Sequence, residues 1–149
     1  MGERRRSVGS FEVRRQTGSN EVIDRLFVYA TLRQGQTARS LIANQITRSA
    51  QAWTTGAIYV FPMGYAGFVE ADEPHRVVGE VLWLTELPAT FGLLDAYEGH
   101  DFARVIKQVT LESGEPVWCW LYVLADPDAA QHGRRIEHGD WARYWSEQG

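Results

Sequence analysis

Apolar and polar positions alternate along this chain in short blocks, a pattern that predicts several strands and few helices. The expected strands are residues 26–32, 57–61, 77–84, 103–111 and 116–124. The last two form the clearest hairpin, because only a short polar turn containing Gly114 separates them. In the second strand of this hairpin apolar side chains occupy both faces, which is typical of a strand that is covered on both sides.

Apolar residues at helical spacing predict three helices, at residues 37–50, 87–98 and 140–145. Thr37 is a suitable N-cap for the first helix. Pro88 in the first turn of the second helix and Gly99 just past its end are the residues expected at a helix start and stop. In the third, Trp141 and Trp145 are four residues apart and are expected to form its buried face.

The expected order of elements is β-α-β-β-α-β-β-α, in which strands follow one another rather than alternating strictly with helices. This order favours an α+β domain with a small, mixed, barrel-like sheet flanked by helices over a doubly wound nucleotide-binding fold. Residues 1–24 are rich in Arg, Ser, Gly, Glu and Gln and predict a flexible N-terminal tail. The domain is expected to occupy residues 25–149, a length suited to one hydrophobic core.

Composition narrows the range of partners. The net charge of −4 gives no electrostatic reason to expect nucleic acid or an anionic membrane surface as a partner. No apolar run approaches the length needed to span a bilayer. Cys119 is the only cysteine, so an intrachain disulfide is excluded and a reducing, cytoplasmic compartment is favoured. The composition therefore predicts a cytoplasmic monomer or small homo-oligomer.

A carboxylate continues the apolar stripe of the 87–98 helix. The stripe, spaced by four, three and four residues, consists of Leu87, Phe91, Leu94 and Glu98. Glu98 is therefore expected to point inward or into a cleft, at the negative end of the helix dipole, where burial and the dipole both raise its pKa towards neutrality. Such a group suits a general base that later acts as an acid. The alternative is that the helix ends earlier and Glu98 faces solvent or pairs with Arg104.

The loop that follows the first strand is a second candidate for chemistry. Residues 29–35 leave a buried strand, where consecutive backbone N–H groups at a sheet edge can hold a carboxylate. Thr31 adds a hydroxyl group and Arg33 a positive charge. The loop lacks the pattern of a phosphate-binding P-loop, so phosphate binding is not supported. By itself the loop is a weak signal, because most loops between a strand and a helix are plain structural connections.

Other reactive residue types give weaker signals. The four histidines are scattered without the spacing typical of zinc ligands, so no metal is expected. Cys119 alternates within an apolar strand, which predicts an inert core thiol. Asp95 and Asp101 are expected to be ordinary exposed residues, and Tyr122 is a candidate for the wall of a pocket.

Five segments, in order, resemble the γ-glutamylcyclotransferase-like family, which includes the AIG2-like proteins. The family's aromatic strand ending in Tyr-Gly-[Thr/Ser]-Leu-[Arg/Lys]-x-Gly corresponds to residues 29–35, YATLRQG. Its Leu-Asp-x-x-Glu-Gly helix end corresponds to residues 94–99, LDAYEG. Shorter matches are VGEV at residues 78–81, FAR at 102–104 and GDWARY at 139–144. Together the matches cover residues 25–145.

The resemblance implies a small β-barrel flanked by helices and a cofactor-independent γ-glutamyl cyclotransferase. The backbone around four residues would bind the γ-glutamyl group of a small substrate: Tyr29, Ala30, Thr31 and Leu32. Glu98 would be the catalytic residue that moves the proton, while the α-amine of the substrate attacks its own γ-carbonyl. The products would be 5-oxoproline and an amine or amino acid.

One departure from the family pattern keeps a second hypothesis open. Ala30 stands where the motif has Gly, and a Cβ there would strain the turn or crowd the pocket if the position requires positive φ or close approach to a ligand. The alternative function is a non-catalytic module of the same fold that binds a small metabolite or a protein partner.

Overall fold

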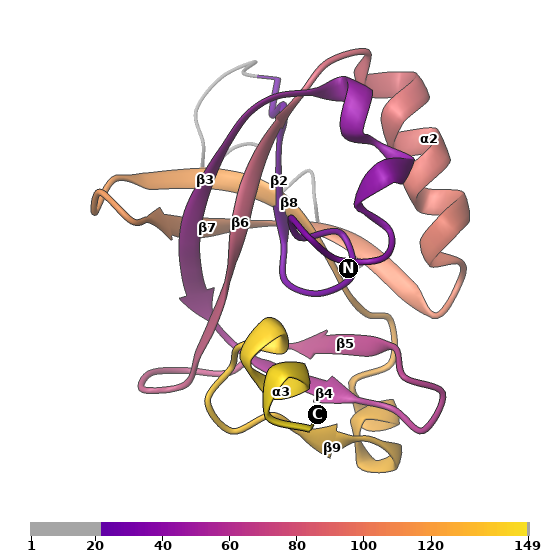
Figure 1. Cartoon of the computed structure of the whole chain (residues 1–149), viewed down its shortest axis with the longest axis vertical. Helices are drawn as coiled ribbons and strands as arrows, with labels where there is room; N and C mark the ends of the chain where they lie inside the picture. The colour runs from indigo at the N-terminus through magenta and orange to yellow at the C-terminus, as the bar shows by residue number, and fades with distance from the viewer. Residues whose placement is uncertain (1–21, 149) are drawn as a thin grey trace, which may run out of the picture.

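In the computed structural model, which describes residues 22–148, five strands close a barrel (Figure 1). In order around the barrel they are β2 (Arg25–Val28), β6 (Arg76–Leu84), β3 (Ile46–Thr55), β7 (Phe102–Leu111) and β8 (Pro116–Leu124). β2 runs parallel to β8, with Leu26 opposite Trp120, and the other pairs are antiparallel. The prediction of an α+β fold with a mixed, barrel-like sheet is therefore confirmed.

A second, three-stranded sheet lies at one end of the barrel, and the α-helices of residues 22–148 lie outside the barrel (Figure 1). The sheet consists of β5 (Ala66–Val69), β4 (Ala57–Val60) and β9 (Arg134–Arg135). The helices are α2 (Leu87–Glu98) and α3 (Trp141–Gln148), with 3-10 turns η1 (Arg39–Leu41), η2 (Ala43–Gln45) and η3 (Pro127–His132). No helix among residues 22–148 is long and apolar enough to cross a membrane.

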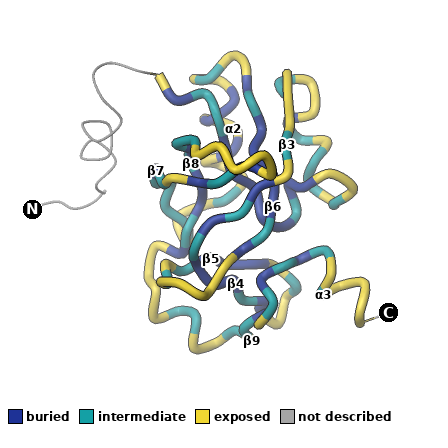
Figure 2. The backbone as a smooth tube through the Cα atoms, turned by 90° about the vertical axis from the view of Figure 1, so that its left-hand side faces the viewer, coloured by how far each residue is buried: buried dark blue, intermediate teal, exposed yellow. Residues whose placement is uncertain are grey.

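Alternation along the barrel strands divides the buried side chains into two cores. Phe27 of β2 and Leu121 of β8 point into the barrel core, which extends to the three-stranded sheet. Their neighbours Leu26 and Tyr122 point outward into a helix-side core, where Leu94 of α2 covers them. Figure 2 shows the buried segments passing through the barrel strands. The prediction that β8 is covered on both sides is confirmed, because its successive residues Leu121 and Tyr122 are buried in the two different cores.

The predicted helix at residues 37–50 is wrong. This segment forms the two short turns η1 and η2 and then enters β3 at Ile46. Ile42 is fully buried in the helix-side core, but the polar residues that follow pair along β6, with Ala50 opposite Val81. Backbone pairing with a buried neighbouring strand therefore outweighs the weak helical periodicity of the segment.

The remaining elements agree with expectation more closely. The β7–β8 hairpin and the α2 helix lie where they were predicted, and Gly99 closes α2 with φ 78° and its N–H bonded to the Asp95 carbonyl. In α3, Trp141 is buried as expected, but Trp145 is 42% exposed, so the predicted buried pair is half wrong. Of the N-terminal tail predicted at residues 1–24, residues 1–21 lie outside the described part of the chain. Ile23 is buried, and its carbonyl accepts a hydrogen bond from Trp120.

Candidate active site

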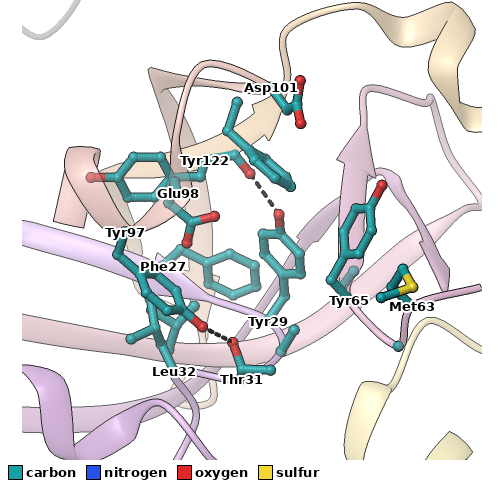
Figure 3. Close-up of a pocket in the computed structure, with 15 residues that line it drawn as sticks. Phe27, Tyr29, Thr31, Leu32, Met63, Tyr65, Tyr97, Glu98, Asp101 and Tyr122 are labelled. Carbon is teal, nitrogen blue, oxygen red and sulfur yellow. Dashed lines mark hydrogen bonds between the residues drawn. The ribbon is translucent and has the colours of Figure 1, made fainter. Parts of the chain in front are cut away.

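A cavity of about 400 Å³ opens where the loop after β2, the end of α2 and the β4–β5 loop meet (Figure 3). All five residues singled out from the sequence line it: Tyr29, Ala30, Thr31, Leu32 and Glu98. The opposite wall comes from the β4–β5 loop with Met63 and Tyr65, while Asp101 and Tyr122 complete the lining together with their neighbours. The structure thus joins two segments that are almost 70 positions apart in the sequence, and the chemical roles assigned to their residues stay predictions.

Glu98 extends from the last turn of α2 into this cavity, as the stripe on the helix predicts. Phe91 and Leu94 of the same stripe are buried in the helix-side core, and Glu98 itself is partly buried. Burial raises the pKa of Glu98 to about 7. Among residues 22–148 no cation forms an ion pair with Glu98, because Arg104, the alternative partner, binds Asp95 instead, with Nε 3.0 Å from Oδ1. Glu98 is therefore a carboxyl group that can exchange a proton near neutral pH.

The loop after β2 offers the cavity unused backbone donors. Its turns are closed by bonds from Arg33 N–H to the Ala30 carbonyl at 3.0 Å and from Ala38 N–H to the Thr31 carbonyl at 2.8 Å. Within the described part of the chain, none of the turn and loop bonds uses the N–H groups of Ala30, Thr31 or Leu32. Buried backbone donors are normally paired, so these three are suited to an acceptor group on a ligand.

Two carboxylates outside the cavity lining, Glu80 and Asp140, anchor this loop. Glu80 of β6 is 4% exposed and accepts the Gln34 N–H at 3.1 Å and the Arg39 guanidinium at 2.8 Å. Arg33, also buried, donates to Asp140 at 2.9 Å, just before α3. Burial raises the pKa of Asp140, but hydrogen bonds from Arg33 and from backbone N–H groups of α3 outweigh it and hold the pKa below its usual range. The loop is therefore fixed to the barrel on one side and to α3 on the other.

Three tyrosines form the polar wall of the cavity. The Tyr29 hydroxyl donates to the Tyr122 carbonyl at 2.7 Å, and the Tyr122 hydroxyl donates to Asp95 at 2.6 Å. Burial, followed by the charge of Glu98, raises the pKa of Tyr29 well above its ordinary value, so this hydroxyl stays protonated. The Tyr97 hydroxyl lies 3.2 Å from the Thr31 hydroxyl, joining the end of α2 to the loop after β2 (Figure 3).

The model of the family described as gamma-glutamyl cyclotransferase, AIG2-like, matches residues 26–143. The chain belongs to this family. No curated protein matches the sequence.

Several solved structures share the fold of this chain at low sequence identity. YkqA from Bacillus subtilis superposes with a TM-score of 0.67 at 24% identity, over 86% of this chain and 44% of YkqA. The uropathogenic Escherichia coli-specific protein c4763 superposes with a TM-score of 0.63 at 19% identity, over 85% of this chain and 98% of c4763. An AIG2-like protein from Mus musculus superposes with a TM-score of 0.61 at 20% identity, over 81% of this chain and 89% of the mouse protein. The chain thus spans less than half of YkqA but nearly the whole of the two smaller proteins.

The substitution that distinguishes this chain from the family motif does not strain the backbone. Among residues 22–148, Glu86 is the only non-glycine residue with positive φ, so Ala30 has an ordinary backbone conformation. Ala30 is buried and lines the cavity, so the turn accommodates this side chain without backbone strain.

Sequence reasoning missed two groups that shape the AIG2-like site. Glu80 was recognised only as part of a motif, although a lone acidic residue within an apolar strand is a signal for a buried, paired charge. Asp95 is exposed, as predicted, but it also binds Arg104 and Tyr122 and so connects α2 to the β7–β8 hairpin, which the sequence did not indicate. Asp95, Arg104 and Tyr122 meet only because α2 packs beside β7 and β8.

In the described part of the chain no three His, Cys, Asp or Glu side chains form a group that could hold a metal ion. Burial raises the pKa of Cys119 to about 12, and its side chain lies in the barrel core away from the cavity. His100 beside the Glu98 turn is almost fully exposed, with Nε2 3.7 Å from Oδ1 of Asp101. The titratable group that enters the cavity with a pKa near neutrality is therefore Glu98.

Proposed function

We propose that this protein is a cofactor-independent γ-glutamyl cyclotransferase that converts a small γ-glutamyl amine or peptide into 5-oxoproline and a free amine. The observation that carries the proposal is the position of Glu98. A carboxyl group with a pKa of about 7 and no ion pair within residues 22–148 lines the same cavity as Ala30, Thr31 and Leu32, whose backbone N–H groups take part in none of the turn and loop bonds of the described residues. Membership of the gamma-glutamyl cyclotransferase, AIG2-like family supports the same reaction class.

In the proposed reaction the loop after β2 binds the γ-glutamyl part of the substrate. The N–H groups of Ala30, Thr31 and Leu32 donate to its carboxylate or carbonyl oxygens, and charge-assisted bonds of this kind are stronger than neutral ones. The substrate is thereby folded so that its α-nitrogen approaches its own γ-carbonyl carbon. An intramolecular attack held in this geometry gains much of its acceleration from orientation alone.

Glu98 provides the proton transfers of the proposed reaction. Its carboxylate takes one proton from the α-ammonium group, and the free amine then forms a bond to the γ-carbon. Glu98 returns that proton to the amide nitrogen as the bond from this nitrogen to the γ-carbon breaks, and it then accepts the second proton from the new ring nitrogen. A base with a pKa near the working pH is effective in both directions.

Release of 5-oxoproline, measured by mass spectrometry, tests the proposal. The wild type is assayed on a panel of γ-glutamyl amines and dipeptides beside Glu98→Gln, with Glu112→Gln in the exposed β7–β8 turn as a matched control. We expect release by the wild type and the control, and a loss of at least about a hundredfold in Glu98→Gln. No release by folded wild type from any substrate would refute the proposal and favour a binding module of the same fold.

A further inference from the structure

The charges around the cavity are all of one sign. Its lining includes two carboxylates, Glu98 and Asp101, and among the residues that the structure describes it includes no Lys, Arg or His. A substrate whose leaving group ends in a carboxylate would find no cation on this wall. A leaving group that ends in an ammonium ion would find an opposite charge at the mouth of the cavity.

Within residues 22–148, the arginines on the segments that border the cavity are bound to carboxylates. Arg33 and Arg39 lie behind the loop after β2, each within 3 Å of its own carboxylate partner, Asp140 and Glu80. Arg104 is held by Asp95 and packs over the ring of Phe91, on the far side of α2. Turning any of them towards a substrate would leave a carboxylate unpaired, which opposes such a movement.

The wall opposite Glu98 is suited to an amine. Met63 and Tyr65 of the β4–β5 loop are 87% and 45% exposed, and both line the cavity (Figure 3). The Tyr65 ring stacks on Phe61 with centroids 4.8 Å apart, which holds it in place on this wall. A methylene chain packs against such a surface, and an ammonium ion is attracted to an aromatic ring and to a nearby carboxylate.

On this basis, and resting on the proposed function, we infer that the substrate is a γ-glutamyl diamine. Its leaving amine carries a second, distal ammonium group that lies between Asp101 and the β4–β5 loop. The γ-glutamyl end occupies the loop after β2, Glu98 lies at the scissile amide, and the aliphatic chain passes along Met63 and Tyr65. Asp101 is the specificity-determining residue for the charge of the leaving group. Its carboxylate is 76% exposed, so its effect is that of a partly screened ion pair.

Three substrates of nearly equal length test the inference: the γ-glutamyl amides of 1,4-diaminobutane, n-pentylamine and 4-aminobutanoate. They end in an ammonium ion, a methyl group and a carboxylate. Release of 5-oxoproline from each substrate is measured at pH 8. We expect kcat/KM for the diamine to exceed that for pentylamine by about fivefold. The carboxylate substrate should rank lowest, and the preference should shrink as salt is added.

Variants of Asp101 separate specificity from general damage. Asp101→Asn should bring the ratio of diamine to pentylamine close to one, and Asp101→Lys should reverse it in favour of the carboxylate substrate. Asp72→Asn, another exposed aspartate outside the cavity, should keep the wild-type ratio. Turnover of all three substrates with no preference for the diamine, or with ratios unchanged in Asp101→Lys, would overturn the inference while leaving the cyclotransferase proposal intact. Release from none of the three would overturn the inference, and the cyclotransferase proposal would fall with it only if the wider panel of γ-glutamyl amines and dipeptides also gave no release.

Discussion

Replacing Glu98 with glutamine should stabilise the fold above pH 7 in addition to removing turnover. Burial moves the pKa of Glu98 from 4.5 to about 7, so ionising this side chain costs more in the folded state than in the unfolded chain. A shift of this size corresponds to at most about 3 kcal/mol. Below pH 4.5 both states hold the proton and the cost is absent. As the pH rises to 7 only the unfolded state has released it, so the stability of the wild type falls over this window.

Glutamine does not titrate, so the variant should escape this loss. Urea unfolding of both proteins at pH 4.5 and pH 8 gives the change in their stability difference, which should favour Glu98→Gln by about 2–3 kcal/mol at the higher pH. Glu112→Gln in the exposed turn is the control and should show no such change. If the difference between wild type and Glu98→Gln is the same at both pH values, Glu98 is solvated. The argument for a base near neutrality would then fail.

Three further predictions concern the surroundings of the site. Glu80→Gln should raise KM more than it lowers kcat, because the loop after β2 loses the charge that anchors it. The same variant should lose about 2–3 kcal/mol of stability in urea unfolding. A change in kcat alone would contradict this role of Glu80. Thermal melts test two glycines. Gly79→Ala should cost about 3 kcal/mol of stability or prevent folding, because the added Cβ would overlap the Val28 carbonyl. Gly92→Ala on the open face of α2 should leave the stability unchanged or raise it by up to about 1 kcal/mol. Cys119 should react with a thiol reagent only after denaturation, since burial raises its pKa to about 12, and rapid labelling of the native protein would refute its placement.

The parts of this structure that the sequence predicts are those with a strong local period. The stripe on α2 runs through two buried residues to Glu98, and the position of this carboxylate follows from helical spacing alone. The β7–β8 hairpin follows from alternation and a Gly-containing turn. Both patterns are set by neighbours within four residues, so tertiary contacts do not have to be known in advance.

Features that depend on a distant partner were not predictable in the same way. The segment after Thr37 has helical spacing in its apolar residues, but β6 lies beside it and its backbone pairs there instead. The network of Asp95 joins α2 to side chains on two strands of the barrel. In each case the deciding energy comes from a strand far away in the sequence, whose position no local pattern specifies.

The parallel pairing of β2 with β8 has a consequence for biosynthesis. Tyr29 and Tyr122, whose hydrogen bond joins these strands beside the cavity, are 93 positions apart. At ordinary translation rates of roughly 5–20 residues per second, the ribosome needs on the order of 5–20 s to pass from one to the other. During this time β2 has no partner on its β8 side, and its apolar residues lack half of their cover. The barrel and its cavity therefore form only after β8 has emerged, and nascent chains that end before β8 expose an apolar edge to chaperones and to one another.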